Sequence, residues 1–146
     1  WATSRLALMA VMAPFAAARN IELAFEPAVD RAPVAAEPSV LHDILSNLID
    51  NAIRYTHDDG SVVVTVVASD GRYAVKIADN GPGIAAEHRE RVFDRFYRIP
   101  AANRPAGSGL GLAIVRTLLR QSAGTIELTD GIGGRGLTIT ISFPAR

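Results

Sequence analysis

The stretch SVLHDILSNLIDNAIRY, residues 39–55, has the strongest helical period in the chain and decides its fold. Its apolar residues recur every three or four positions, so they line up along one side of a helix. This stripe consists of Leu41, Ile44, Leu45, Leu48, Ile49 and Ala52. A helix with such a wide apolar stripe packs that side against another layer of secondary structure.

Strand signals lie on both sides of this helix in the sequence. They occur at residues 21–25, 61–68, 72–78, 125–129 and 136–143. Ser69-Asp70-Gly71 reads as a hairpin turn between the second and third strands, and a glycine-rich turn precedes the last one. Helical spacing recurs at residues 8–16 and 109–121, with a shorter helix expected over Ala85–Phe93. This order predicts an α/β (α+β) two-layer sandwich, in which a mixed, largely antiparallel five-stranded sheet carries three main helices on one face.

The composition is that of one globular domain. The chain has 146 residues, of which 49% are hydrophobic and 21% charged, with a formal net charge of zero. This balance gives no general electrostatic reason to bind nucleic acid or an anionic membrane. The absence of cysteine excludes disulfides and thiolate metal sites. No apolar run reaches the roughly 20 residues that span a bilayer.

The helix of residues 39–55 also carries a line of polar side chains. Asn47, Asn51 and Arg54 are spaced i, i+4 and i+7, so they share one face beside the apolar stripe. A single Asn is ordinary at the polar edge of a helix, but two Asn followed by a cation favour a ligand. Amide oxygens suit Mg²⁺ and a guanidinium suits phosphate.

The segment Asp79-Asn80-Gly81-Pro82-Gly83-Ile84 follows a strand directly. On its own it is strong turn chemistry. Its two glycines also allow a backbone to approach a flat ligand closely, and Asp79 is placed to accept an amino proton from the edge of a base. Both interpretations remain open from these residues alone.

Gly107-Ser108-Gly109-Leu110-Gly111-Leu112 leads from a loop into a helix. Backbone N–H groups at a helix N-terminus form a phosphate site when no side chains obstruct them. The spacing does not fit a Rossmann loop, and the Gly-Lys-Ser/Thr of a Walker loop is missing. Before this loop, Phe93 and Phe96 flank Arg95. They anchor the loop to the core or, in the functional interpretation, anchor a lid that brings Arg95 or Arg98 to phosphate.

In their order and spacing, these four stretches resemble the four sequence boxes of the histidine kinase catalytic domain. That domain has the Bergerat (GHKL) ATP-binding fold, shared with gyrase-type and chaperone ATPases. The resemblance covers about Ile21 to Phe143. It implies ATP and Mg²⁺ as cofactors, with Asn51 as the Mg²⁺ ligand and Asp79 as acceptor of the adenine amino group. The nucleotide-binding residues that it implies are Asn47, Asn51, Arg54, Tyr55, Asp79, Gly81, Gly83, Ile84, Arg98, Gly107, Ser108, Gly109, Leu110, Gly111 and Leu112.

Position 47 distinguishes the possible activities. ATPases of this superfamily generally carry a Glu four residues before the metal-binding Asn, where it activates water. Asn47 cannot act as a base, so transfer to a histidine is favoured over hydrolysis. An ATP-sensing binding module, or an ATPase with an unusual base, remains the alternative.

No histidine of this chain suits the role of phosphoacceptor. His42 lies on the same helix as Asn51, and we interpret His57 and His88 as surface residues. We therefore assign no certain catalytic residue here. The resemblance places the acceptor on a separate dimerisation domain, with residues 1–19 as the end of its linker and residues 20–146 as the catalytic domain. It also implies a response regulator as an indirect partner, and a cytoplasmic position in a protein anchored in the bacterial inner membrane.

Overall fold

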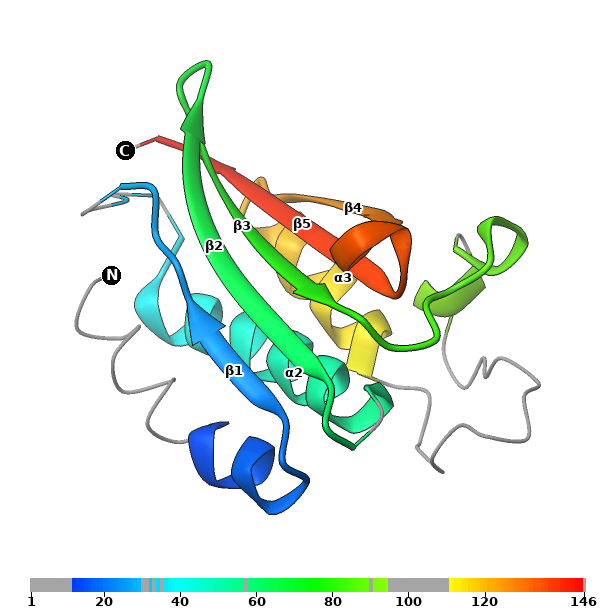
Figure 1. Cartoon of the computed structure of the whole chain (residues 1–146). Helices are drawn as coiled ribbons and strands as arrows, with labels where there is room; N and C mark the ends of the chain where they lie inside the picture. The colour runs from blue at the N-terminus through cyan, green and yellow to red at the C-terminus, as the bar shows by residue number, and fades with distance from the viewer. Residues whose placement is uncertain are drawn as a thin grey trace.

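The sheet has five strands in the order β1-β2-β3-β5-β4 (Figure 1). The computed structural model describes residues 12–29, 32, 34, 36–56, 58–89, 91–94 and 111–145. The strands are β1 (Glu22–Phe25), β2 (Ser61–Ser69), β3 (Arg72–Asp79), β4 (Thr125–Asp130) and β5 (Leu137–Pro144). β1 runs parallel to β2, and every other pairing is antiparallel. The prediction of a mixed, largely antiparallel five-stranded sheet is confirmed.

Two helices, α2 (Pro38–Tyr55) and α3 (Gly111–Gln121), cover one face of this sheet and pack against each other (Figure 1). A third helical segment, residues 12–18, adds Met12 and Ala16 to the same core. The buried residues of α2 are the predicted stripe together with Ile53. No helix among the described residues is long and apolar enough to span a bilayer.

The chain between β3 and α3 differs from its prediction. In place of one short helix over Ala85–Phe93, it forms two 3-10 turns, η1 (Ala86–His88) and η2 (Arg91–Phe93). The His88 amide donates to the carbonyl of Ala85, 2.9 Å away, which is the i to i+3 bond of a 3-10 turn. The carbonyl of Ile84 accepts from the Arg89 side chain, at 3.0 Å. These bonds favour tight turns over a continuous α-helix.

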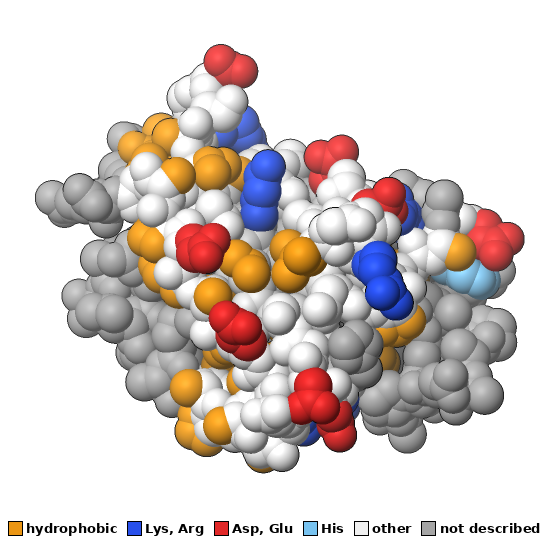
Figure 2. Space-filling view, in the orientation of Figure 1, with side chains coloured by type: hydrophobic (Ala, Val, Ile, Leu, Met, Phe, Trp, Pro, Cys, Tyr) orange, Lys and Arg blue, Asp and Glu red, His pale blue; other side chains and the backbone are white. Residues whose placement is uncertain are grey.

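One face of the sheet packs against the helices, and the other face is more exposed. Along β2, Val62, Val64 and Val66 are buried, while Val63 and Thr65 on the other face are only partly buried. This alternation is typical of a sheet with one face on the core. Figure 2 shows the molecule in the same orientation as Figure 1, with small apolar patches separated by acidic and basic side chains on the side away from the helices.

Replacement of Leu48 should cost much of the stability of the domain. Leu48 lies in the middle of α2 and is fully buried. We expect Leu48→Ala to lower the free energy of unfolding by about 2–5 kcal/mol, the range for large-to-small changes in a core. Urea denaturation followed by circular dichroism measures this change. Ile114→Ala is the matched control, because Ile114 on α3 is 46% exposed. Equal losses in the two variants would contradict the assigned core.

Candidate functional site

A buried carboxylate stands where three segments of the chain meet. Asp79, the last residue of β3, is 8% exposed. Its Oδ1 accepts hydrogen bonds from the amide of Gly81 at 2.9 Å and from the amide of Leu137 at 3.2 Å. A carboxylate is rarely this buried unless such donors satisfy it. The two amides therefore fix Asp79 between the segment after β3 and the first residue of β5.

Glycines allow the backbones of these two segments to pack directly on each other. A Cβ on Gly136 would lie 2.2 Å from the carbonyl oxygen of Asp79, and one on Gly131 would lie 2.1 Å from the same atom. Gly83 has φ +72°, and its Cβ would lie 2.6 Å from the carbonyl oxygen of Gly136. No side chain fits at these positions without displacing backbone. Close packing of the two segments thus holds Asp79 in place.

The polar line of α2 borders this arrangement through the end of the helix. A Cβ on Gly81 would lie 3.1 Å from both the carbonyl oxygen of Tyr55 and the Cα of Thr56. Tyr55 and Asn51 are partly buried, whereas Arg54 is exposed. The structure thus brings together the end of α2 and the segment after β3, which the sequence assigned to one site.

The polar side chains of α2 differ in what they already bind. The Asn47 amide donates to the carbonyl of Asp43 at 2.8 Å, and Arg54 forms an ion pair of 3.1 Å with Asp50. An exposed i, i+4 pair of this kind contributes only about 0.3–0.5 kcal/mol, so it holds Arg54 weakly. Among the described residues, Asn51 has no hydrogen-bond partner for its side chain. An unpaired amide oxygen suits a hard cation, so Asn51 fits the predicted metal-binding role.

A buried hydroxyl close to Gly81 was not predicted. Thr56 is 1% exposed, and its Oγ1 is the one buried side-chain polar atom without a hydrogen-bond partner in the described part of the chain. Such groups are rare, because each costs about 1–3 kcal/mol. The sequence gives no signal for it, since Thr56 reads as an ordinary residue at the end of a helix.

Two further contacts hold the segments around the site. Arg89 donates to the carbonyl of Ile84 and to a carboxylate oxygen of Asp130, each at 3.0 Å. The Arg116 guanidinium of α3 lies 5.3 Å from the centre of the Phe93 ring in η2. The contacts of Arg89 with Asp130 and of Arg116 with Phe93 join residues far apart in the sequence, and neither arginine was predicted to take part. The contact of Phe93 with α3 agrees with its predicted anchoring role.

The predicted phosphate loop is only partly described. Gly111 is the first residue of α3, and Leu112 is partly buried and packs against the core. The other predicted residues of this region lie outside the described residues: Arg95, Phe96, Arg98, Gly107, Ser108, Gly109 and Leu110. His57, which follows the end of α2 in the sequence, also lies outside them. Their roles therefore stay predictions.

Comparison with known proteins gives a consistent set of relatives. The model of the family described as histidine kinase-, DNA gyrase B-, and HSP90-like ATPase matches residues 36–146. The swarming motility regulation sensor protein RssA of Serratia marcescens is 36% identical over 133 residues, which are 90% of this chain and 28% of RssA. The chain therefore spans less than two thirds of that relative's length.

Two solved structures have the same fold. The mycobacterial sensor histidine kinase MprB is 30% identical, with a TM-score of 0.81 and coverage of 95% of this chain and 93% of MprB. Full-length ShkA in complex with AMPPNP is also 30% identical, with a TM-score of 0.84, and is covered over 99% of this chain and 30% of ShkA. The residue pattern and the fold thus lead to the same group of proteins.

Proposed function

Because this chain belongs to the family of histidine kinase-, DNA gyrase B- and HSP90-like ATPases, we propose that it is the ATP-binding catalytic domain of a sensor histidine kinase. In this proposal it binds Mg-ATP and donates the γ-phosphate to a histidine on a separate dimerisation domain. The likeness to MprB over 93% of that structure supports the kinase branch of the family. The AMPPNP complex of ShkA, at 30% identity, supports a triphosphate ligand, since AMPPNP is an analogue of ATP.

The observation that carries the proposal is the fixed, buried carboxylate of Asp79. Two backbone amides hold one of its oxygens, at 2.9 and 3.2 Å. In this proposal the carboxylate accepts a hydrogen bond from the exocyclic amino group of adenine. Guanine has a carbonyl at the equivalent position, so two acceptors would face each other. Preorganised acceptors of this kind give base selectivity, because the wrong partner leaves a buried group unpaired.

The phosphate side of the site would depend on α2 and the start of α3. Bound Mg²⁺ would neutralise charge on the phosphate oxygens, and Asn51 is the residue that would ligate it. Arg54 would exchange its exposed Asp50 partner for phosphate. The helix dipole of α3 favours negative charge at Gly111, its first residue. Positioning and charge neutralisation are the main requirements of phosphoryl transfer.

The chain offers no base for hydrolysis at position 47. The side-chain nitrogen of Asn47 donates to a carbonyl of its own helix, which leaves the amide oriented along α2. An amide cannot take a proton from water, whereas a histidine acceptor is itself a nucleophile. His42 lies earlier on the same rigid helix as Asn51, so it cannot approach a phosphate held there. We therefore place the acceptor outside this chain.

The remaining parts of the proposal concern the whole protein. The dimerisation domain would precede residues 1–19, which would form the end of its linker. A response regulator would receive the phosphoryl group from that domain. The chain would then work as the cytoplasmic part of a kinase anchored in the bacterial inner membrane. The likeness to RssA, a sensor protein of which this chain matches 28%, supports a longer sensor protein with further domains.

Phosphohistidine is stable to base and labile to acid, and this property gives the test. We expect the chain alone to release little phosphate from ATP and to acquire no acid-labile label from [γ-³²P]ATP. The full-length protein should acquire such a label, and Asn51→Ala in that protein should abolish it. Steady hydrolysis by the chain alone, lost in Asn51→Ala, would favour the ATPase alternative. Nucleotide binding with no label in the full-length protein would favour the sensing module.

A further inference from the structure

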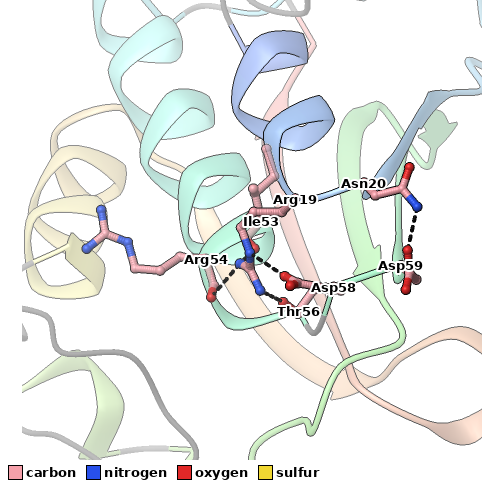
Figure 3. A network of polar contacts seen from close by, with 7 residues as sticks. All are labelled: Arg19, Asn20, Ile53, Arg54, Thr56, Asp58 and Asp59. Carbon is pink, nitrogen blue, oxygen red and sulfur yellow. Dashed lines mark hydrogen bonds and ion pairs between the residues drawn. The ribbon is translucent and has the colours of Figure 1, made fainter.

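No left-handed glycine caps the C-terminal end of α2. The helix ends at Tyr55, and the C-cap residue Thr56 that follows has an extended backbone (φ −79°, ψ 141°). The last carbonyls of an α-helix lack partners inside the helix and need others. The carbonyl of Ala52 is satisfied by the Thr56 amide, at 3.0 Å. The carbonyls of Ile53, Arg54 and Thr56 instead accept hydrogen bonds from Arg19, which lies 34 residues before Ile53 (Figure 3).

The Arg19 guanidinium is the cap of this helix. Nη1 donates to the carbonyls of Ile53 and Arg54, the latter at 2.9 Å, and Nη2 donates to the carbonyl of Thr56. Nε donates to a carboxylate oxygen of Asp58 at 3.0 Å. A planar cation with five N–H donors meets both needs of a helix C-terminus, because it satisfies several carbonyls and complements the dipole. A lysine ammonium cannot span the same three acceptors.

The backbone beside Arg19 strengthens this contact. The Asp59 amide donates to the carbonyl of Arg19 at 3.4 Å, and the Asn20 side chain donates to that of Asp59 (Figure 3). The Glu22 amide donates to the carbonyl of Gly60 at 3.0 Å, where β1 begins to pair with β2. The segment before β1 is thus attached to the end of α2 through side chains and backbone together.

The end of α2 that Arg19 holds is also a wall of the candidate site. Tyr55 and Thr56 contact Gly81 so closely that a Cβ there would lie 3.1 Å from each. The Gly81 amide in turn donates to Asp79 Oδ1 at 2.9 Å. A short series of contacts therefore leads from Arg19 through the last turn of α2 to the carboxylate. A shift of that turn moves the surface against which Gly81 and Asp79 are placed.

We propose that Arg19 is a positioning residue for nucleotide binding, and that it couples the helical segment of residues 12–18 to the site. The inference rests on the proposed function, because it takes the ligand at Asp79 to be an adenine nucleotide. Met12 and Ala16 belong to the core, at 8% and 2% exposure, so this segment is docked against the domain. Binding equilibria are reciprocal: if the segment affects nucleotide affinity, nucleotide affects the segment equally.

Hydrogen exchange with and without Mg-ADP tests the coupling in the unaltered chain. We expect saturating Mg-ADP to slow exchange at the amides of Gly81 and Leu137, which bind Asp79. It should also slow exchange at the amides of Arg19, Asn20 and Ile21, which close the helical segment by bonding to the carbonyls of residues 16 and 17. Protection at Gly81 and Leu137 without any at residues 19–21 would overturn the coupling. Absence of protection at both places would instead refute nucleotide binding, and with it the proposed function.

Substitution of Arg19 tests the positioning role. We expect Arg19→Ala to weaken Mg-ADP binding about tenfold by calorimetry, within the usual range of coupling between sites. In this variant, saturating Mg-ADP should still protect Gly81 and Leu137 but no longer residues 19–21. Arg19→Lys should recover part of the affinity, and it serves as the test if Arg19→Ala does not fold. Arg72→Ala is the matched control, because Arg72 also donates to a side chain and a carbonyl, those of Ser142, but far from Asp79 along β3. Unchanged affinity in both Arg19 variants, or an equal loss in Arg72→Ala, would overturn the proposal.

Discussion

Asp79→Asn should abolish most nucleotide binding while the domain stays folded. The amide oxygen of Asn can still accept the hydrogen bonds from the amides of Gly81 and Leu137, so these two backbone donors keep an acceptor. The Asn side chain then has an NH₂ group where the carboxylate had its second oxygen. Two hydrogen-bond donors, this NH₂ group and the adenine amino group, would face each other. Loss of a hydrogen bond to a charged group costs about 1.5–3 kcal/mol, which corresponds to roughly a 10- to 150-fold weaker Kd.

Titration of the variant with Mg-ADP by calorimetry measures this loss, and circular dichroism checks the fold. Asp130→Asn is the matched control. Asp130 pairs with Arg89 near the same site, but its side chain is 71% exposed. Its replacement should change the Kd less than about twofold, since exposed pairs contribute little. If Asp79→Asn bound Mg-ADP as tightly as the unaltered chain, Asp79 would not be the base-binding residue.

The parts of the fold that were predictable have a local pattern. The apolar period of residues 39–55 predicts α2 and its buried side, and all six predicted stripe residues are buried. Ser69-Asp70-Gly71 predicts the β2–β3 hairpin, in which Ser69 pairs with Arg72 and both turn residues have positive φ. Hydrophobic period and turn chemistry are properties of neighbouring residues, so one sequence suffices to find them.

The contacts that fix Asp79 are not local. The Leu137 amide is 58 residues away from it, and Gly131 and Gly136, which allow this approach, were interpreted as a turn residue and as the start of a strand. Likewise, nothing near Arg19 in the sequence shows that it caps a helix ending at Tyr55. A local motif can therefore nominate a binding side chain such as Asp79, but it does not show which distant residues hold that side chain in place. The one short helix expected over Ala85–Phe93 was wrong in a segment where Arg89 binds both the nearby carbonyl of Ile84 and the carboxylate of Asp130, 41 residues away.

These nonlocal contacts and the side chains proposed to bind the ligand occupy the same short segments. The last turn of α2 carries the exposed Arg54 and the partly buried Tyr55, and it presents the carbonyls of Ile53 and Arg54 to Arg19. The segment after β3 carries Asp79 and also Gly81, which touches that turn. Substitutions at the site therefore need controls that separate loss of a ligand contact from movement of the backbone.

Asn51→Ala should remove the Mg²⁺ dependence of nucleotide binding. Asn51 is partly buried on α2, and among the described residues its side chain has no hydrogen-bond partner, so its loss breaks no hydrogen bond of the described fold. If its amide oxygen ligates Mg²⁺, the unaltered chain binds ADP more tightly with Mg²⁺ than with EDTA. The variant should show the same weak affinity in both conditions. We expect a loss of about tenfold or more in Mg²⁺, since even substitutions outside the ligand shell cost about 10- to 100-fold in metal affinity.

Asn51→Asp distinguishes loss of Mg²⁺ ligation from a change in the size of the side chain. A carboxylate of the same size is a stronger ligand for Mg²⁺, so the Mg²⁺ dependence should persist or increase in this variant. Calorimetry of all three proteins, each with Mg²⁺ and with EDTA, gives six affinities from one ligand. In EDTA, Asn51→Asp should bind ADP more weakly than the unaltered chain, because its new charge then faces the phosphates unneutralised. An equal effect of Mg²⁺ on Asn51→Ala and on the unaltered chain would place the metal elsewhere, even if both variants still bound ADP through Asp79.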